Sequence, residues 1–170
     1  LHGALLDGRL WRRDAGAWRD MGRRGVEVFT LSAGPDGLER IYAAGDGLWV
    51  SDDGGASWRA GDPTARRWDV TCVAGDANDS DVAYLGTLWH GAFRTADACR
   101  TWTPAGRGVG RRLVTAVAAS PDDPGRMVVG TIDGLYCSGD VGETWASCSD
   151  ALDGVFVQAV ALDPANPGHL

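Results

Sequence analysis

The stretch "SDDGGASW", residues 51–58, combines two adjacent aspartates, two adjacent glycines and a closing tryptophan. Taken alone it has three interpretations: a metal-binding loop, a pair of catalytic carboxylates, or a turn that needs these residue types to fold. The stretch recurs as "TADACRTW" at 95–102 and as "SGDVGETW" at 138–145. The shared pattern is Ser/Thr, any residue, Asp, any residue, Gly, any residue, Ser/Thr and Trp, with Cys99 replacing the glycine in the second copy.

A shorter version, "RRDAGAW" at 12–18, keeps the aspartate, the glycine and the tryptophan but lacks both hydroxyl residues. The closing tryptophans of the four copies, Trp18, Trp58, Trp102 and Trp145, are 40, 44 and 43 residues apart. An internal period of about 40–45 residues indicates a repeat architecture.

Three other phrases keep the same period, and each is a short run rich in valine, aromatic residues and threonine. The first phrase starts at Val28, Val70, Val114 and Val157. The second covers 40–45, 81–86 and 126–130, and the third covers 47–51, 91–95 and 134–138. Because Gly, Pro, Asp and Asn separate the runs and no segment has a sustained helical period, strands joined by turns are predicted.

The predicted fold is all-β: a β-propeller of four-stranded blades with about four repeat units. The units cover approximately 1–27, 28–69, 70–113 and 114–156, and residues 157–170 begin the next unit or close the first. Two arrangements are open, a closed ring of four blades and an arc of a propeller with about six to eight blades. We expect the arc, because both ends of the sequence fall inside predicted strands.

The octapeptides at 51–58, 95–102 and 138–145 resemble Asp-boxes, also called BNR repeats. Such repeats occur in sialidases, sortilin-type receptors, xyloglucanase-like glycoside hydrolases and photosystem assembly factors. The resemblance covers nearly the whole chain and implies a propeller fold. It does not imply one activity, because this fold serves both enzymes and binding proteins.

Each octapeptide is predicted to be the hairpin turn between the third and fourth strands of its blade. Its aspartate can accept hydrogen bonds from backbone N–H groups ahead of it, its glycine permits positive φ, and its tryptophan can pack on the neighbouring sheet. A calcium loop would need more oxygen ligands and a bidentate glutamate, which the stretch lacks, so no metal is predicted. The predicted structural residues are Ser51, Asp53, Gly55, Ser57, Trp58, Thr95, Asp97, Thr101, Trp102, Ser138, Asp140, Gly142, Thr144 and Trp145.

Two finer expectations concern these turns. The hydroxyl residues Ser57, Thr101 and Thr144 are expected to start the fourth strands. Cys99 is expected to strain its turn or to force a different one, so the second octapeptide should differ most in shape.

The charge composition is unusual, because all 16 basic residues are arginine while the chain has 23 acidic residues and a net charge of −7. This bias resembles proteins of halophiles and predicts no nucleic-acid partner, since a negative field repels phosphates. No run of about 18 apolar residues occurs, so no membrane-spanning helix is predicted. A cytoplasmic location is expected, although a signal peptide upstream is neither seen nor excluded.

The four cysteines, Cys72, Cys99, Cys137 and Cys148, have no CxxC spacing and no nearby histidine, which argues against a zinc site. Two interpretations stay open for them. We favour buried free thiols in a reducing compartment over one or two disulfides in a secreted protein.

If the octapeptides face one side of the blades, ligand-binding loops should gather on the opposite side. Pairs of arginines precede the first strands of three successive blades: Arg23 and Arg24, Arg66 and Arg67, and Arg111 and Arg112. They are either counter-charges for surrounding aspartates or a cluster that binds carboxylates or phosphates through bidentate hydrogen bonds. Replacing Arg67 and Arg112 by alanine would test the second interpretation.

The loops between second and third strands add Asp46, Trp89, His90 and Asp133 to the same side. An exposed Trp89 beside His90 suits stacking on a sugar or another flat ligand, whereas packing of Trp89 on the adjacent blade is the structural alternative. The expected partners are therefore a protein, a small anion or a saccharide.

Catalysis has weak support in the sequence. A sialidase would need an Arg-Ile-Pro phrase and a tyrosine nucleophile, but Tyr42, Tyr84 and Tyr136 lie at matching positions in strand phrases and are predicted to be core. Asp46 and Asp133 could form a carboxylate pair, although Asp-Gly turns explain both better. We therefore predict a non-catalytic recognition platform without cofactors, with a sialidase-like or xyloglucanase-like glycoside hydrolase as the alternative.

Overall fold

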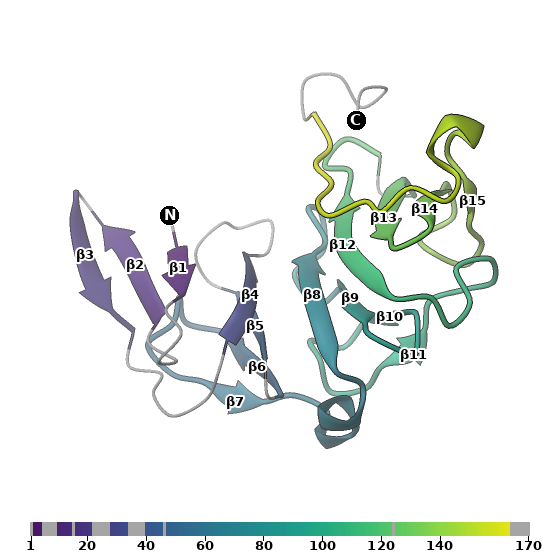
Figure 1. Cartoon of the computed structure of the whole chain (residues 1–170). Helices are drawn as coiled ribbons and strands as arrows, with labels where there is room; N and C mark the ends of the chain where they lie inside the picture. The colour runs from purple at the N-terminus through teal and green to yellow at the C-terminus, as the bar shows by residue number, and fades with distance from the viewer. Residues whose placement is uncertain are drawn as a thin grey trace.

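The computed structural model of the 170-residue chain describes residues 2–4, 10–14, 16–21, 28–33, 40–45, 47–123 and 125–163. Figure 1 shows four antiparallel sheets side by side in an arc, with β4, β8 and β12 on its inner side and β3, β7, β11 and β15 outermost. The chain is thus an arc of β-propeller blades, as predicted. We refer to each sheet as a blade.

Three blades have four strands in simple sequential order. The strands of the second blade are β4 (Val28–Ala33), β5 (Ile41–Gly45), β6 (Leu48–Ser51) and β7 (Arg59–Ala60). Those of the third blade are β8 (Val70–Gly75), β9 (Ala83–Thr87), β10 (Ala92–Thr95) and β11 (Thr103–Pro104). Those of the fourth blade are β12 (Val114–Ala119), β13 (Met127–Thr131), β14 (Gly134–Ser138) and β15 (Ala146–Ser147).

The first blade has three described strands, β1 (His2–Ala4), β2 (Leu10–Asp14) and β3 (Ala17–Asp20). β1 contacts β4 of the next blade, as β5 contacts β8 and β9 contacts β12. By this position β1 is a second strand, and β2 and β3 are the third and fourth strands of their blade. Two short 3-10 helices, η1 (Pro63–Arg67) and η2 (Asp150–Leu152), complete the described elements.

The repeated strand phrases therefore form the predicted first, second and third strands, with one exception. Residues 157–163 have no strand partner among the described residues, so the strand predicted from Val157 is not formed. The fourth strands are shorter than expected. They begin two residues after Ser57, Thr101 and Thr144, so these hydroxyl residues belong to the turn and do not start the strand.

The hydrophobic core lies between neighbouring blades. One buried cluster joins Tyr42 and Val50 of the second blade to Leu85 of the third, and another joins Tyr84 of the third to Val129 of the fourth. Burial of apolar side chains from both partners stabilises the stacking. Tyr42 and Tyr84 are buried, which confirms their assignment to the core, whereas Tyr136 is only half-buried.

The cysteines divide between the two interpretations left open by the sequence. Cys72 and Cys99 are free and buried, in agreement with the favoured interpretation. That interpretation is wrong for Cys137 and Cys148, which form a disulfide. The β14–β15 hairpin pairs Cys137 with Ala146 and so brings Cys148 close to it across the octapeptide turn.

In the described part of the chain, no helix has the length and apolar character needed to cross a membrane.

Candidate functional site

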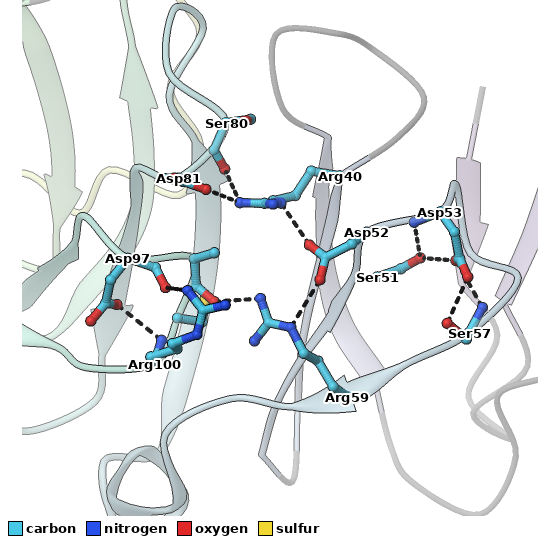
Figure 2. A network of polar contacts seen from close by, with 12 residues as sticks. Arg40, Ser51, Asp52, Asp53, Ser57, Arg59, Ser80, Asp81, Asp97 and Arg100 are labelled. Carbon is cyan, nitrogen blue, oxygen red and sulfur yellow. Dashed lines mark hydrogen bonds and ion pairs between the residues drawn. The ribbon is translucent and has the colours of Figure 1, made fainter.

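The octapeptide turn is built on its aspartate, as the polar contacts in Figure 2 show for Asp53. Asp53 Oδ1 accepts from the backbone N–H of Ser57 at 2.8 Å, and Asp53 Oδ2 accepts from the Ser57 hydroxyl at 2.6 Å. The Ser51 hydroxyl donates to Asp53 Oδ1 at 2.8 Å and accepts from the N–H of Gly55 at 2.7 Å. The aspartate therefore stabilises a turn, as predicted.

The other two octapeptides repeat these bonds. Asp97 accepts from Thr101, and Asp140 accepts from Thr144, in each case through both the backbone N–H and the hydroxyl. Cys99 adopts a φ of +64° while its N–H donates to Thr95 Oγ1 at 3.1 Å. Cysteine thus takes the strained conformation of the missing glycine, and the expectation that this turn would differ in shape is wrong.

The hydrogen bonds make these carboxylates weak bases near neutral pH. The hydrogen bonds from Ser57, Thr101 and Thr144 are the main cause that lowers the pKa of Asp53, Asp97 and Asp140 to about 2. A catalytic base needs a pKa near the working pH. Among the described residues no group of three or more acidic, cysteine or histidine side chains is arranged to hold a metal ion.

The lowered pKa values predict that acid weakens the fold. An unfolded aspartate titrates near 3.8 and the folded ones near 2, so the unfolded state binds more protons between about pH 4 and pH 2. The contribution of these aspartates to the free energy of unfolding should therefore be constant above about pH 5. It should fall as the pH drops from about 4 to about 2. Urea unfolding followed by circular dichroism between pH 2.5 and 6 measures this pH dependence in the wild type and in Asp97→Asn. An equally steep decline in Asp97→Asn would contradict the assignment.

The octapeptide turns also join neighbouring blades through backbone hydrogen bonds, which the sequence did not predict. We call residues 61–69 and 105–113, between a fourth strand and the next first strand, exit segments. The N–H of Asp62 donates to Cys99 O at 2.9 Å, and the N–H of Arg107 donates to Glu143 O at 2.9 Å. Each of these exit segments thus bonds to the octapeptide of the following blade. The sequence signal for this joint is the nearly constant spacing between a fourth strand and the next octapeptide.

An ion-pair network on the same side links the second blade to the third (Figure 2). Arg40 Nε lies 2.8 Å from Asp52 Oδ1, and the Arg40 guanidinium also pairs with Asp81 of the next blade. Arg59 pairs with Asp52 at 2.9 Å and donates to Ala98 O at 2.7 Å. Burial raises the pKa of Asp52, but Arg59 and Arg40 outweigh burial and lower it overall. Asp52 and Asp81 therefore act as counter-charges for arginines at the contact between the two blades.

On the opposite side, the arginine pairs are not equivalent. Arg112 donates to Asp133 Oδ2 at 3.0 Å and to Val109 O at 2.8 Å, and its guanidinium lies 4.9 Å from the Tyr136 ring centroid. Trp68, two residues before β8 as Arg112 is before β12, stacks on Phe93 at 4.1 Å in the same way. Arg112 therefore packs as a structural residue, so its choice as a ligand-binding residue is not supported by its contacts.

Arg67 and Arg111 are the matching pair, because each lies three residues before a first strand. Both side chains are exposed and form no ion pair with any described residue. The structure describes only the backbone of Arg66, and Arg23 and Arg24 lie outside the described residues. Counting back from the first-strand valines would have identified this equivalence from sequence.

The loop after β9 lies between the two segments that carry these arginines. The N–H of Leu88 donates to Asp69 O at 3.0 Å, two residues after Arg67. At the other end of the loop, a Cβ on Gly91 would lie 2.0 Å from Gly110 O, beside Arg111. Three segments, 63–69, 87–91 and 108–112, therefore meet on this side. We call this surface the rim.

Trp89 lies in the middle one of these three segments with 59% of its surface exposed, which contradicts the alternative that it is packed on the adjacent blade. His90 is half-buried, and its Nδ1 is enclosed without a hydrogen-bond partner among the described residues. The rim thus combines a flat apolar ring, an imidazole and two exposed guanidinium groups.

The candidate carboxylate pair of Asp46 and Asp133 is described only at Asp133, because Asp46 lies outside the described residues. Asp133 accepts from Arg112 and from the Thr131 hydroxyl. The hydrogen bond from Thr131 is the main cause that lowers the pKa of Asp133, so this group is a poor proton donor.

Comparison with known proteins identifies relatives among propellers. No family model matches the chain. The oligoxyloglucan-reducing end-specific xyloglucanase of Emericella nidulans is 30% identical in an alignment of 145 positions, and the match covers 74% of this chain and 18% of the relative. The chain thus spans under a fifth of the length of that curated relative.

Two solved structures illustrate the range of similar folds. The GH74 enzyme of Niastella koreensis has a TM-score of 0.76 and 18% identity, covering 95% of this chain and 29% of that one. YCF48 bound to D1 peptide has a TM-score of 0.61 and 16% identity, covering 88% of this chain and 50% of that one. Identities this low show the fold alone, and that fold is the β-propeller.

Proposed function

We propose that this chain is a non-catalytic recognition platform whose rim binds an anionic ligand, either an acidic peptide or a small acid. The observation that carries the proposal is the meeting of segments 63–69, 87–91 and 108–112. It places the loop of the exposed Trp89 between two segments that each carry an exposed arginine. Guanidinium groups bind carboxylates with matched, charge-assisted hydrogen bonds. The aromatic ring adds a flat apolar surface.

The similarity to YCF48 bound to D1 peptide supports a protein partner, since it shows that one propeller of this shape holds a peptide. The resemblance of the octapeptides to Asp-boxes and of the composition to halophile proteins belongs to the same proposal. In this proposal the octapeptide turns stabilise the packing of the blades, and the rim binds the ligand.

The double substitution Arg67→Ala and Arg111→Ala tests the rim. A hydrogen bond to a charged group contributes about 1.5 to 3 kcal/mol, so affinity for a tri-glutamate peptide should fall at least about tenfold. Calorimetry at low and high salt measures the loss, and salt should weaken wild-type binding because these charges are exposed. Arg13→Ala with Arg100→Ala removes the same charge from exposed positions away from the rim and should keep the affinity. Equal affinity in both double variants would contradict the proposal.

A second candidate is a carbohydrate-active hydrolase of the xyloglucanase type, with catalytic groups outside this chain. It is favoured by the 30% identity to the Emericella nidulans xyloglucanase. Trp89 would then stack on a neutral sugar. Binding of a xyloglucan oligosaccharide that is lost in Trp89→Ala but kept in the rim arginine variant would favour this candidate, and the reverse pattern would favour the anion platform.

The cytoplasmic location stays a prediction. The Cys137–Cys148 disulfide is more typical of oxidising compartments. The redox state of these two cysteines in protein purified without reductant would separate the two locations.

A further inference from the structure

The Cys137–Cys148 disulfide is not needed to close its own hairpin. In the second, third and fourth blades, the hairpin of third and fourth strands closes with the same backbone hydrogen bond of 2.9 Å. The donors and acceptors are Gly61 and Leu48, Ala105 and Ala92, and Cys148 and Leu135. The residues equivalent to Cys137 are Val50 and Arg94, so two of the hairpins form without a disulfide. The disulfide therefore adds a constraint on the residues that follow Cys148.

Residues 148–154, which we call the tether, contact the loop between β13 and β14 of the same blade. The N–H of Gly154 donates to Asp133 O at 2.8 Å. A Cβ on Gly134 would lie 3.3 Å from Leu152 O, so the tether passes close to the backbone of this loop. The disulfide fixes the start of the tether, and the tether holds the backbone of Asp133.

Asp133 in turn contacts the rim through its side chain. Asp133 Oδ2 accepts from Arg112 Nε at 3.0 Å. Arg112 Nη1 donates to Gly108 O at 3.0 Å and to Val109 O at 2.8 Å, so it holds the backbone of segment 108–112. Arg111, one of the exposed rim arginines, lies in this segment. A continuous series of contacts thus runs from the disulfide, through the tether and Asp133, to the rim.

The disulfide is accessible to small thiols. Cys137 and Cys148 are half-buried, whereas the free Cys72 and Cys99 are buried. A glutathione thiolate attacks one sulfur and forms a mixed disulfide, and a second glutathione releases the protein thiol. The S–S bond is thereby reduced to two thiols while two glutathione molecules are oxidised to one glutathione disulfide. Disulfides of cytoplasmic proteins are usually of this reversible, redox-sensing kind.

We propose that the Cys137–Cys148 disulfide regulates the rim, with higher ligand affinity in the oxidised protein than in the reduced protein. Reduction frees the start of the tether, so Asp133 and Arg112 hold segment 108–112 less firmly. Ligand binding must then order this segment, and ordering flexible side chains lowers affinity. The Arg112–Asp133 pair is partly exposed, so the loss should be modest, about three- to tenfold. The ligand in this inference rests on the proposed function, but the series of contacts does not.

Hydrogen–deuterium exchange followed by mass spectrometry tests the coupling without a ligand. Reduction by dithiothreitol should speed amide exchange in residues 106–113 and leave β5 of the second blade unchanged. Asp133→Asn removes the charge that holds Arg112, so residues 106–113 of this variant should exchange fast already in the oxidised protein and respond little to reduction. An unchanged rate in residues 106–113 of the wild type, an equal increase in β5, or a full response in Asp133→Asn overturns the proposal.

Calorimetry with the tri-glutamate peptide tests the regulation. The double substitution Cys137→Ser and Cys148→Ser should weaken binding about three- to tenfold, and dithiothreitol should weaken wild-type binding equally. Dithiothreitol should not change the affinity of the double variant, which controls for effects on the two free thiols. Equal affinity of oxidised and reduced wild type overturns the regulation and leaves the proposed function intact. Absence of binding in both states contradicts the proposed function, and the exchange rates then decide whether the disulfide is coupled to the rim.

Discussion

Replacement of Trp145 by alanine should lower the free energy of unfolding by about 3 to 5 kcal/mol, the cost of removing a buried aromatic side chain. Only 7% of the Trp145 surface is exposed, and the ring belongs to the cluster between the third and fourth blades. Its Nε1 donates to Ala105 O and to Gly142 O, both at 3.1 Å. The substitution therefore opens a cavity between blades and leaves two carbonyls without their donor.

The chain supplies a matched control for this prediction. Trp18 closes the shortest copy of the octapeptide and has 49% of its surface exposed, so Trp18→Ala should cost less than about 1 kcal/mol. Trp102 is 8% exposed but its Nε1 has no hydrogen-bond partner among the described residues. Trp102→Phe should accordingly be tolerated better than Trp145→Phe. Urea unfolding at one fixed protein concentration, followed by far-UV circular dichroism, ranks the variants, and an equal loss for Trp18 and Trp145 would contradict the proposed packing.

The residues that could be predicted from sequence are those whose partners lie close along the chain. Asp53 accepts a hydrogen bond from Ser57 four residues ahead, so the residue types and their spacing were enough to predict a turn. The first three strands of each unit were predictable for a related reason. Each is a short apolar run between turn residues, and the same run recurs in each repeat unit.

The features that were missed depend on contacts between residues that lie far apart along the chain. Arg40 pairs with Asp81 of the next blade, and no equivalent residues repeat this pair in the other described units, so the period could not indicate it. Arg112 was grouped with Arg111 because the two are adjacent in sequence, whereas its register matches Trp68 and its guanidinium packs on Tyr136 as Trp68 packs on Phe93. Side chains of different chemistry can thus occupy one structural position.

The strand predicted from Val157 failed for a physical reason of the same kind. A first strand is stabilised by its pairing with a second strand, as Val114–Ala119 pairs with β13. The residues from Val157 onward have the composition of a strand and the correct contact to the preceding blade, but no described strand pairs with them. Local sequence indicated the position, and the missing partner decided the secondary structure.

The joint between exit segment and octapeptide predicts a second large effect, at Gly106. Gly106 has a φ of +67°, and a Cβ there would lie 2.2 Å from both Gly142 O and Glu143 O. Alanine in this left-handed conformation costs roughly 1 to 2 kcal/mol, and the clash with two backbone carbonyls adds about 1 to 3 kcal/mol. Gly106→Ala should therefore lower the free energy of unfolding by about 2 to 5 kcal/mol.

Gly110→Ala separates the two contributions, because Gly110 lies in the same exit segment with a φ of +62°, but an added methyl group there would meet only the Arg112 side chain, at 3.6 Å. It should lose only the conformational cost of roughly 1 to 2 kcal/mol. The difference between the two variants then measures how closely the exit segment must approach the next octapeptide. If both substitutions cost the same in urea unfolding, close contact at this joint does not hold the blades together, and the octapeptides stabilise only their own hairpins.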